Sequence, residues 1–183
     1  MRHLLAALIL CVSGPCWAGA DIPAPAETFG HEVGADRKLI PYPDVLSYLE
    51  SVAAASDRVS IEEAGRSTFD NPMKVVILTS PENQAKLERL REIARLLAKP
   101  GDLTPDQSQQ LIDEGKVIAL VTCTIHSTEV GSTQMVTEFV HDFATTDDPE
   151  KLAWMDEAVL LVMPSINPDG QIMIVDWYNE WLG

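Results

Sequence analysis

The chain of 183 residues is long enough for one ordinary domain, and 46% hydrophobic against 22% charged residues indicates a folded core. Its 28 acidic and 13 basic residues give a formal net charge of −15 at pH 7. Nucleic acids and anionic membrane surfaces are bound through basic patches, so this balance excludes both as expected partners.

The first twenty residues have the features of a secretory signal peptide. A positive charge in Met1–His3 is followed by the apolar run 4–12, the helix-breaking Ser13-Gly14-Pro15 and the small residues Ala18-Gly19-Ala20. The apolar run is shorter than the roughly 20 residues that span a bilayer. We predict a signal peptide over residues 1–20, export to the periplasm or beyond the cell, and a mature chain without a membrane anchor. A buried N-terminal helix is the alternative, but it does not explain the order of these features.

Export determines how the cysteines are interpreted. Cys11 and Cys16 are lost with the signal peptide, so Cys123 alone remains and no internal disulfide is expected. Cys123 lies in an apolar stretch and is predicted to be a small buried residue.

The first part of the mature chain predicts a lead-in, a helix and a pair of strands. Residues 21–40 are rich in Pro, Ala and Gly and predict an extended segment. Apolar residues recur at helical spacing over Asp44–Ala55. The segments Val59–Ala64 and Met73–Thr79 favour strands, and the short polar turn between them makes these strands expected neighbours.

The rest of the chain alternates between helical and strand patterns. A capping serine with proline and glutamate behind it starts a helix at Ser80, and a capping box starts another at Thr104. The predicted elements are a helix over Ser80–Ala98, a helix over Thr104–Gly115, a strand over Lys116–Thr124, a helix over Ser132–Ala144 and a strand over Ala158–Met163.

These elements predict an α/β fold, a three-layer α/β/α sandwich around a mixed and mostly buried sheet. Continuous apolar strands are typical of a sheet that helices cover on both faces. After Pro164 the pattern gives no clear element, and residues 172–182 are apolar and aromatic with no later segment to pack against. We therefore expect a domain that is incomplete at its C-terminus.

His126 and Glu129 follow the C-terminal end of the strongest predicted strand. Ligands of open α/β sheets bind outside the carboxyl ends of strands, and imidazole nitrogen and carboxylate oxygen both suit Zn²⁺. A catalytic zinc takes three protein ligands, and this pair supplies two. On spacing alone, the pair is equally compatible with an exposed loop in which Glu129 lies at a helix start. In the same way, Asn167-Pro168-Asp169-Gly170 by itself predicts only a turn.

Taken together, these segments resemble the zinc carboxypeptidase family. The resemblance rests on Ile125-His126-Ser127 with Glu129 after a strand, on Asn167-Pro168-Asp169-Gly170 after the next strand, and on the turn Gly65-Arg66-Ser67. It implies that His126 and Glu129 are zinc ligands and that residues 41–183 are the N-terminal part of a catalytic domain acting on peptides or proteins. It implies no catalytic role for Asn167 or Asp169.

The chain departs from the family pattern in what it lacks. The resemblance implies a third zinc ligand, a histidine, beyond Asn167–Gly170, with a general-base glutamate and substrate-binding arginines later still. The last histidine is His141, which we expect to pack within a helix, and the last arginine is Arg95. We therefore expect these 183 residues alone to bind zinc weakly and to hydrolyse nothing.

Two other functions remain open. Related zinc deacylases of N-acyl amino acids share a ligand pair of this spacing, although Asn167–Gly170 and the signal peptide favour the peptidase. A non-catalytic secreted peptide-binding module is favoured by the missing third ligand.

Overall fold

A computed structural model describes residues 22–182, so the predicted signal peptide lies outside the described residues. The strands are β1 (Val59–Arg66), β2 (Pro72–Leu78), β3 (Val117–Thr122) and β4 (Ala158–Met163). The helices are α1 (Pro25–Phe29), α2 (Tyr42–Ala55), α3 (Pro81–Gln84), α4 (Leu87–Leu97), α5 (Pro105–Glu114), α6 (Val130–Thr145), α7 (Pro149–Glu157) and α8 (Pro168–Trp181), with a 3₁₀ turn η1 (Pro100–Asp102).

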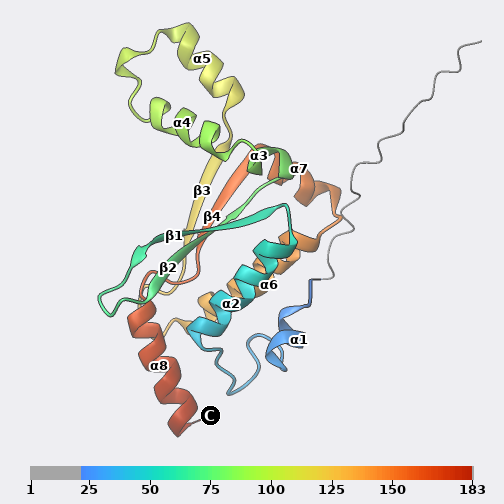
Figure 1. Cartoon of the computed structure of the whole chain (residues 1–183), viewed down its shortest axis with the longest axis vertical. Coiled ribbons are helices and arrows are strands. Elements are labelled where there is room, and N and C mark those ends of the chain that lie inside the picture. Colours follow the sequence, from blue (N-terminus) through green and yellow to red (C-terminus); the bar gives the residue numbers. More distant parts are fainter. Residues whose placement is uncertain (1–21, 183) are drawn as a thin grey trace, which may run out of the picture.

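The four strands form one mixed sheet in the order β1-β2-β4-β3 (Figure 1). The pairs β1–β2 and β2–β4 are antiparallel, whereas β3 and β4 are parallel, with Val121 opposite Val162. The predicted mixed sheet and the neighbouring first two strands are therefore confirmed. Because β3 and β4 are parallel, the loops that follow them leave the same edge of the sheet, and the Ile166 N–H donates to the Cys123 carbonyl between these loops.

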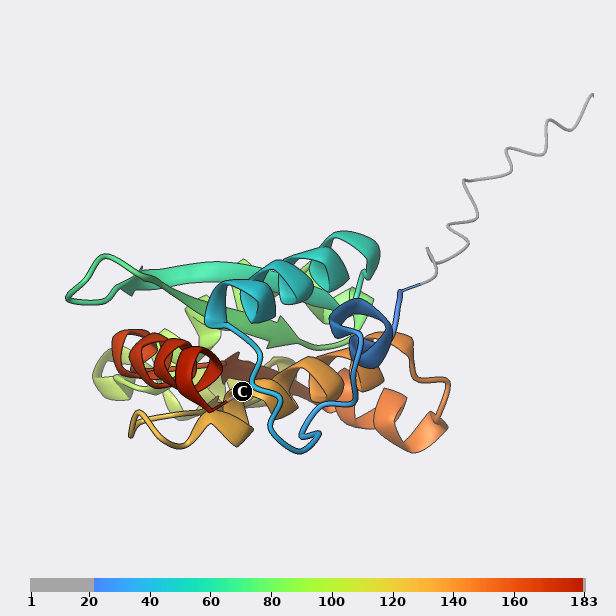
Figure 2. The same cartoon turned by 90° about the horizontal axis from the view of Figure 1, so that it is seen from below.

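Helices α2 and α6 lie side by side over one face of the sheet (Figure 2). Their apolar stripes bury Leu49 and Val52 of α2 and Val136 and Val140 of α6 against the strands. Cys123 belongs to the same core, as predicted, and burial raises the pKa of its thiol. Among residues 22–182, no helix has the length and apolarity needed to cross a membrane.

Helices α4 and α5 cover only one end of the opposite face. Leu90, Ile93 and Leu111 pack there on Ile77 and Val159. The sheet is therefore layered on both faces, as predicted, but it is less buried than its composition suggests. The apolar strand β3 is largely exposed, with Val117 at 68% and Leu120 at 61%. The expected burial of this strand is wrong: five of its six residues are exposed, and their side chains lie on both faces of the sheet.

Before Pro164, three segments depart from the predicted elements. The lead-in 21–40 contains the helix α1 and is not wholly extended. The expected helix Ser80–Ala98 is interrupted at Ala85–Lys86, where the Lys86 backbone is not helical (φ −117°, ψ 9°) and its N–H donates to the Asn83 carbonyl, three residues back. Helix α7 was not predicted, since Met155 is its one buried residue and the apolar pattern is weak.

The segment after Pro164 is a fourteen-residue helix, α8, and not an unorganised end. Asn167 caps it by accepting from the Gly170 N–H, and Pro168 occupies its first turn. Residues typical of a turn are equally good residues for a helix start, which is why the pattern was ambiguous. Trp177 and Trp181 remain more than half exposed, as expected for aromatic residues without packing partners among residues 22–182.

Candidate metal site

The loop between β3 and α6 begins with an unusual backbone turn. Thr124 has φ +48°, in the left-handed region that β-branched residues avoid at a cost of about 1–3 kcal/mol. The turn redirects the chain just after the end of β3. His126 follows two residues later, and its side chain is exposed to solvent. Glu129 is the residue immediately before α6.

His126 and Glu129 face each other across this loop. Their Nδ1 and Oε1 atoms lie 2.8 Å apart, and the His126 N–H donates to Glu129 Oε2 at 3.0 Å. The Glu129 N–H donates to the His126 carbonyl, also at 3.0 Å. Both side chains are open to solvent, with 75% of His126 and 48% of Glu129 exposed. Hydrogen bonds from the side chain and backbone of His126 lower the pKa of Glu129, which keeps it a carboxylate at neutral pH.

The pair has the donor atoms that zinc prefers, and the two atoms converge on one point. Two ligands of a tetrahedral zinc lie roughly 3.4 Å apart, so the observed pair at 2.8 Å would open slightly to hold the ion. Residues 22–182 contain no group of three or more His, Cys, Asp and Glu side chains placed to hold a metal. The described part of the chain thus fits zinc with two ligands, and a complete site needs a third.

The other two described histidines lie in different surroundings. His141 Nε2 is 3.2 Å from the Ile22 carbonyl, in the second half of α6. His31 Nδ1 is 2.9 Å from the carbonyl of Glu32. Each is engaged locally, and the structure brings neither to the pair at 126 and 129.

The start of α8 is interlocked with the candidate metal loop. The Asn167 side-chain N–H donates to the Ile125 carbonyl at 3.0 Å, directly before His126. Gly170 faces Ser127 so closely that a Cβ atom at position 170 would lie 2.2 Å from the Ser127 Oγ. The sequence indicated only a turn here, and the contact between the two loops follows from the parallel pairing of β3 and β4.

Asp169 fastens the loop between β1 and β2 to the same point. It accepts from the Ser67 hydroxyl through a short hydrogen bond, from Asn71 Nδ2 at 2.8 Å and from the Phe69 N–H at 3.1 Å. The hydrogen bond from Ser67, followed by that from Asn71, lowers the pKa of Asp169. The sequence did not reveal this role, because the partners lie about one hundred residues apart.

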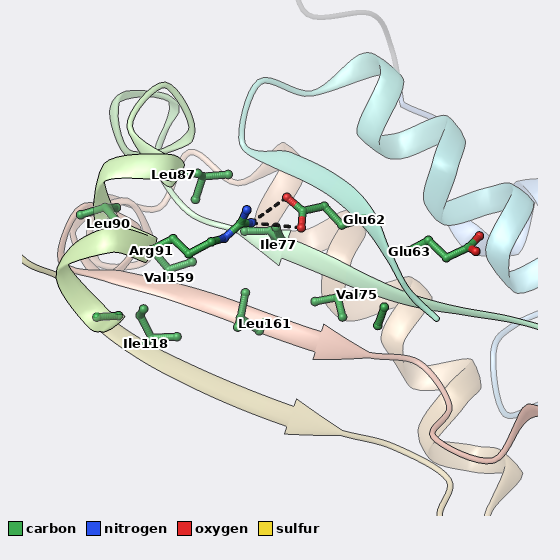
Figure 3. A pocket seen from close by; sticks show the side chains of 12 residues that line it. Glu62, Glu63, Val75, Ile77, Leu87, Leu90, Arg91, Ile118, Val159 and Leu161 are labelled. Atoms are coloured by element: carbon green, nitrogen blue, oxygen red, sulfur yellow. Dashed lines mark hydrogen bonds and ion pairs between the residues drawn. The ribbon is translucent and has the colours of Figure 1, made fainter. Parts of the chain in front are cut away.

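Two of the hollows beside the sheet differ in chemistry. An open pocket beside Glu129 is lined by Thr124, Ile125 and Ser132 and reaches Ile166. A more enclosed apolar pocket of about 270 Å³ lies between α4 and the sheet, toward the start of β3 (Figure 3).

The polar groups at the mouth of the enclosed pocket are already paired with each other. Arg91 donates to both Glu62 oxygens, at 2.8 and 3.0 Å. Arg91 and Glu62 thus neutralise each other at this pocket.

A protein-family model matches most of the chain. The sequence model of the zinc carboxypeptidase family matches residues 45–181, which include both loops of the candidate site. Comparison with curated proteins gives no match.

Solved structures show a similar fold at low sequence identity. Carboxypeptidase A from Helicoverpa armigera is similar at 15% identity and a TM-score of 0.51, over 84% of this chain and 33% of that one. Thrombin activatable fibrinolysis inhibitor is similar at 12% identity and a TM-score of 0.53, over 85% of this chain and 33% of that one. A metallo-carboxypeptidase from Burkholderia cenocepacia has 20% identity and a TM-score of 0.49, over 72% and 28%. The chain thus spans a third or less of the length of these structures.

Proposed function

Because this chain belongs to the zinc carboxypeptidase family, we propose that it supplies His126 and Glu129 to the zinc site of an exported enzyme that hydrolyses peptide bonds. The observation that carries the proposal is the convergence of His126 Nδ1 and Glu129 Oε1, 2.8 Å apart, at the carboxyl end of β3. Zinc held there would supply a Lewis acid for a peptide carbonyl and for an attacking water.

The residues of this chain prepare the pair for that role. Glu129 is a carboxylate at neutral pH, and hydrogen bonds from His126 lower its pKa further. The hydrogen bond from the His126 N–H orients this carboxylate, and the bond from Asn167 to the Ile125 carbonyl fixes the loop from behind. The open pocket beside Glu129 leaves room for a substrate group next to the ion.

Two ligands hold zinc less tightly than three, and peptide hydrolysis also needs a general base. We therefore propose that residues 1–183 alone bind zinc weakly and are inactive, and that a segment outside this chain completes the enzyme. The features of residues 1–20 support export of the protein.

The test is zinc titration of the purified chain, with three variants measured in parallel. His126→Ala and Glu129→Gln each remove one ligand and are expected to weaken zinc binding at least about 10-fold. His141→Ala is the matched control, because the ring of this histidine lies against the Ile22 carbonyl and not beside the pair. Equal zinc affinity in all four proteins would refute the ligand assignment.

Activity distinguishes the remaining functions. The chain alone is expected to release no C-terminal amino acid from peptides, and release that His126→Ala abolishes would show that two ligands suffice. A second candidate, a non-catalytic secreted peptide-binding module, is favoured by the absence of a third ligand among residues 22–182. The DNA downstream of codon 183 separates the two: an open frame with a further histidine and glutamate supports the enzyme. Assays of that longer product with peptides and N-acyl amino acids distinguish a peptidase from a deacylase.

A further inference from the structure

Thr124 keeps its left-handed backbone in spite of its branched side chain, so neighbouring groups must hold it there. Its N–H donates to the Ser132 hydroxyl at 3.2 Å, and its own hydroxyl lies 2.7 Å from the Thr133 hydroxyl. Thr124 is 3% exposed and Thr133 is fully buried, so water does not replace these contacts. Both partners lie in the first turn of α6, directly after the candidate metal loop.

Each of these hydroxyls shares its hydrogen and lone pairs among several neighbours. A hydroxyl has one hydrogen to donate and two lone pairs to accept with. Thr133 lies 2.6 Å from the Pro164 carbonyl, which can only accept, so Thr133 donates there. The Thr124 hydroxyl lies 2.7 Å from Thr133, and it also donates to the Glu129 carbonyl at 2.8 Å, which accepts from Ser132 at 2.9 Å as well. Every hydroxyl hydrogen has a partner in this arrangement.

Thr133 therefore joins three parts of the molecule. Through Thr124 it holds the end of β3, through Pro164 it holds the segment after β4, and its hydroxyl also lies 3.0 Å from Gln171 of α8. Thr133 thus connects two strand ends. The end of β3 leads into Ile125 and His126, and the end of β4 leads into Asn167, which donates to the Ile125 carbonyl.

We propose that Thr133 is a positioning residue for the metal loop, which keeps Thr124 in its turn so that His126 and Glu129 converge. The part of this inference that concerns zinc rests on the proposed function. The part that concerns the loop does not, because the backbone order parameters of residues 125–129 can be measured without any metal.

The decisive comparison is between two valine substitutions in the same helix. Thr133→Val removes the connecting hydroxyl with little change in shape. Thr137→Val is the matched control, because Thr137 is equally buried, lies one turn further along α6 and donates only to the Gln134 carbonyl of its own helix. Thr133→Ser restores the hydroxyl. Thr124→Val removes the other end of the same contact, together with the hydrogen bond from Thr124 to the Glu129 carbonyl, and serves if Thr133→Val does not fold.

The first measurement is backbone ¹⁵N relaxation of the metal-free chain. In Thr133→Val and in Thr124→Val, order parameters over residues 125–129 are expected to fall from about 0.85 to below about 0.6, whereas Thr137→Val and Thr133→Ser keep the native values. The second measurement is zinc titration, in which the first two variants are expected to bind roughly 10-fold or more weakly than the last two.

The outcomes separate the two proposals. An ordered loop in Thr133→Val, or equal loss of order in Thr137→Val, would overturn the positioning role whatever the zinc result. A native chain that binds no zinc at all would refute the proposed function and leave the relaxation comparison to decide the role of Thr133.

Discussion

The side chain of Asn167 donates to the carbonyl of Ile125 at 3.0 Å and accepts from the N–H of Gly170 at 3.1 Å. One amide thus caps helix α8 and holds the loop that carries His126. The start of this helix and the candidate metal loop are therefore linked through one side chain.

Replacement of Asn167 by alanine is expected to destabilise the protein by about 1–2 kcal/mol. The substitution removes a helix cap, worth about 1 kcal/mol, and one further hydrogen bond. Urea unfolding measures the change. Asn179→Ala is the control at the other end of α8, where the exposed side chain donates to the Leu39 carbonyl, and it should change stability by less than about 0.5 kcal/mol. Similar losses in the two variants would contradict the prediction.

A methyl group at position 170 is expected to separate the same two loops. In Gly170→Ala the new Cβ would meet the Ser127 Oγ at 2.2 Å and Asn167 Nδ2 at 2.7 Å, which predicts a destabilisation of about 1–3 kcal/mol. Gly131→Ala is the control, because that helical glycine has no neighbour within 4 Å and alanine there should be neutral or stabilising. Thermal unfolding compares them, and adding Ser127→Ala to Gly170→Ala should recover part of the loss.

Stability is expected to depend on the charge of Asp169 in acid. Hydrogen bonds from Ser67 and Asn71 lower the pKa of this carboxyl below its ordinary value of 3.8. A lowered pKa in the folded state means that the carboxylate stabilises the fold above pH 3.8, and that this contribution is lost as the pH falls through the lowered value. Asp169→Asn should therefore be less stable than the native chain at pH 7, with the gap closing below pH 3.8. Urea unfolding at several pH values measures this, and a gap that stays constant into acid would speak against it.

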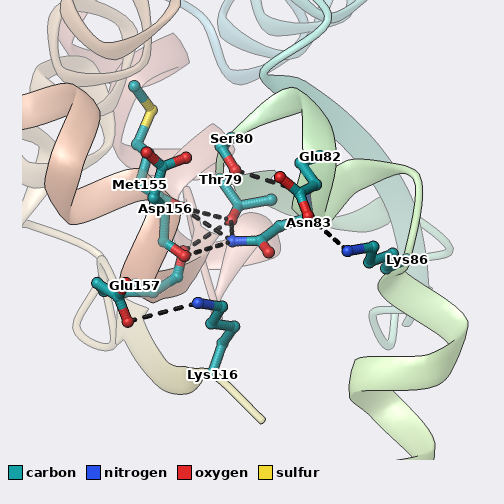
Figure 4. Close-up of polar contacts among 10 residues, drawn as sticks. Thr79, Ser80, Glu82, Asn83, Lys86, Lys116, Met155, Asp156 and Glu157 are labelled. Atoms are coloured by element: carbon teal, nitrogen blue, oxygen red, sulfur yellow. Dashed lines mark hydrogen bonds and ion pairs between the residues drawn. The ribbon is translucent and has the colours of Figure 1, made fainter. Parts of the chain in front are cut away.

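Asn83 is expected to be a main support of the junction between β2 and α7. Its buried Nδ2 lies within 3.1 Å of the Thr79 hydroxyl and of the Met155 and Asp156 carbonyls (Figure 4). Asn83→Ala leaves carbonyls at the end of α7 without this donor and should cost about 1–3 kcal/mol in the free energy of unfolding. Gln109→Ala, which removes an exposed amide bonded to Asp113, should cost less than about 0.5 kcal/mol. A loss for Asn83→Ala no larger than for this control would refute the prediction.

The strands were predictable from sequence because apolar, β-branched runs bounded by polar turns have few other interpretations. The expectation that His126 and Glu129 could meet was also sound, since a spacing of three residues in a tight loop allows it. The burial of β3 was not predictable, because an apolar strand has the same composition whether its edge is covered or free. Helix α7 escaped notice because Met155 alone marks its buried side.

The long-range contacts of the site could not be read from sequence at all. The link between Asp169 and Ser67 depends on β2 and β4 pairing as neighbours, and the link between Thr133 and Pro164 depends on the parallel pairing of β3 and β4. Each follows from the order of the strands, which local patterns do not specify.

The hydrogen bond between Ser67 and Asp169 can form only late in the synthesis of the chain. The two residues are 102 positions apart, so at 5–20 residues per second the ribosome makes Asp169 roughly 5–20 s after Ser67. During that interval the loop between β1 and β2 lacks the Asp169 carboxylate and has only contacts of its own, such as the bond from the Ser67 N–H to the Asn71 carbonyl. The tip of the hairpin therefore gains its link to the rest of the domain only when the chain reaches α8.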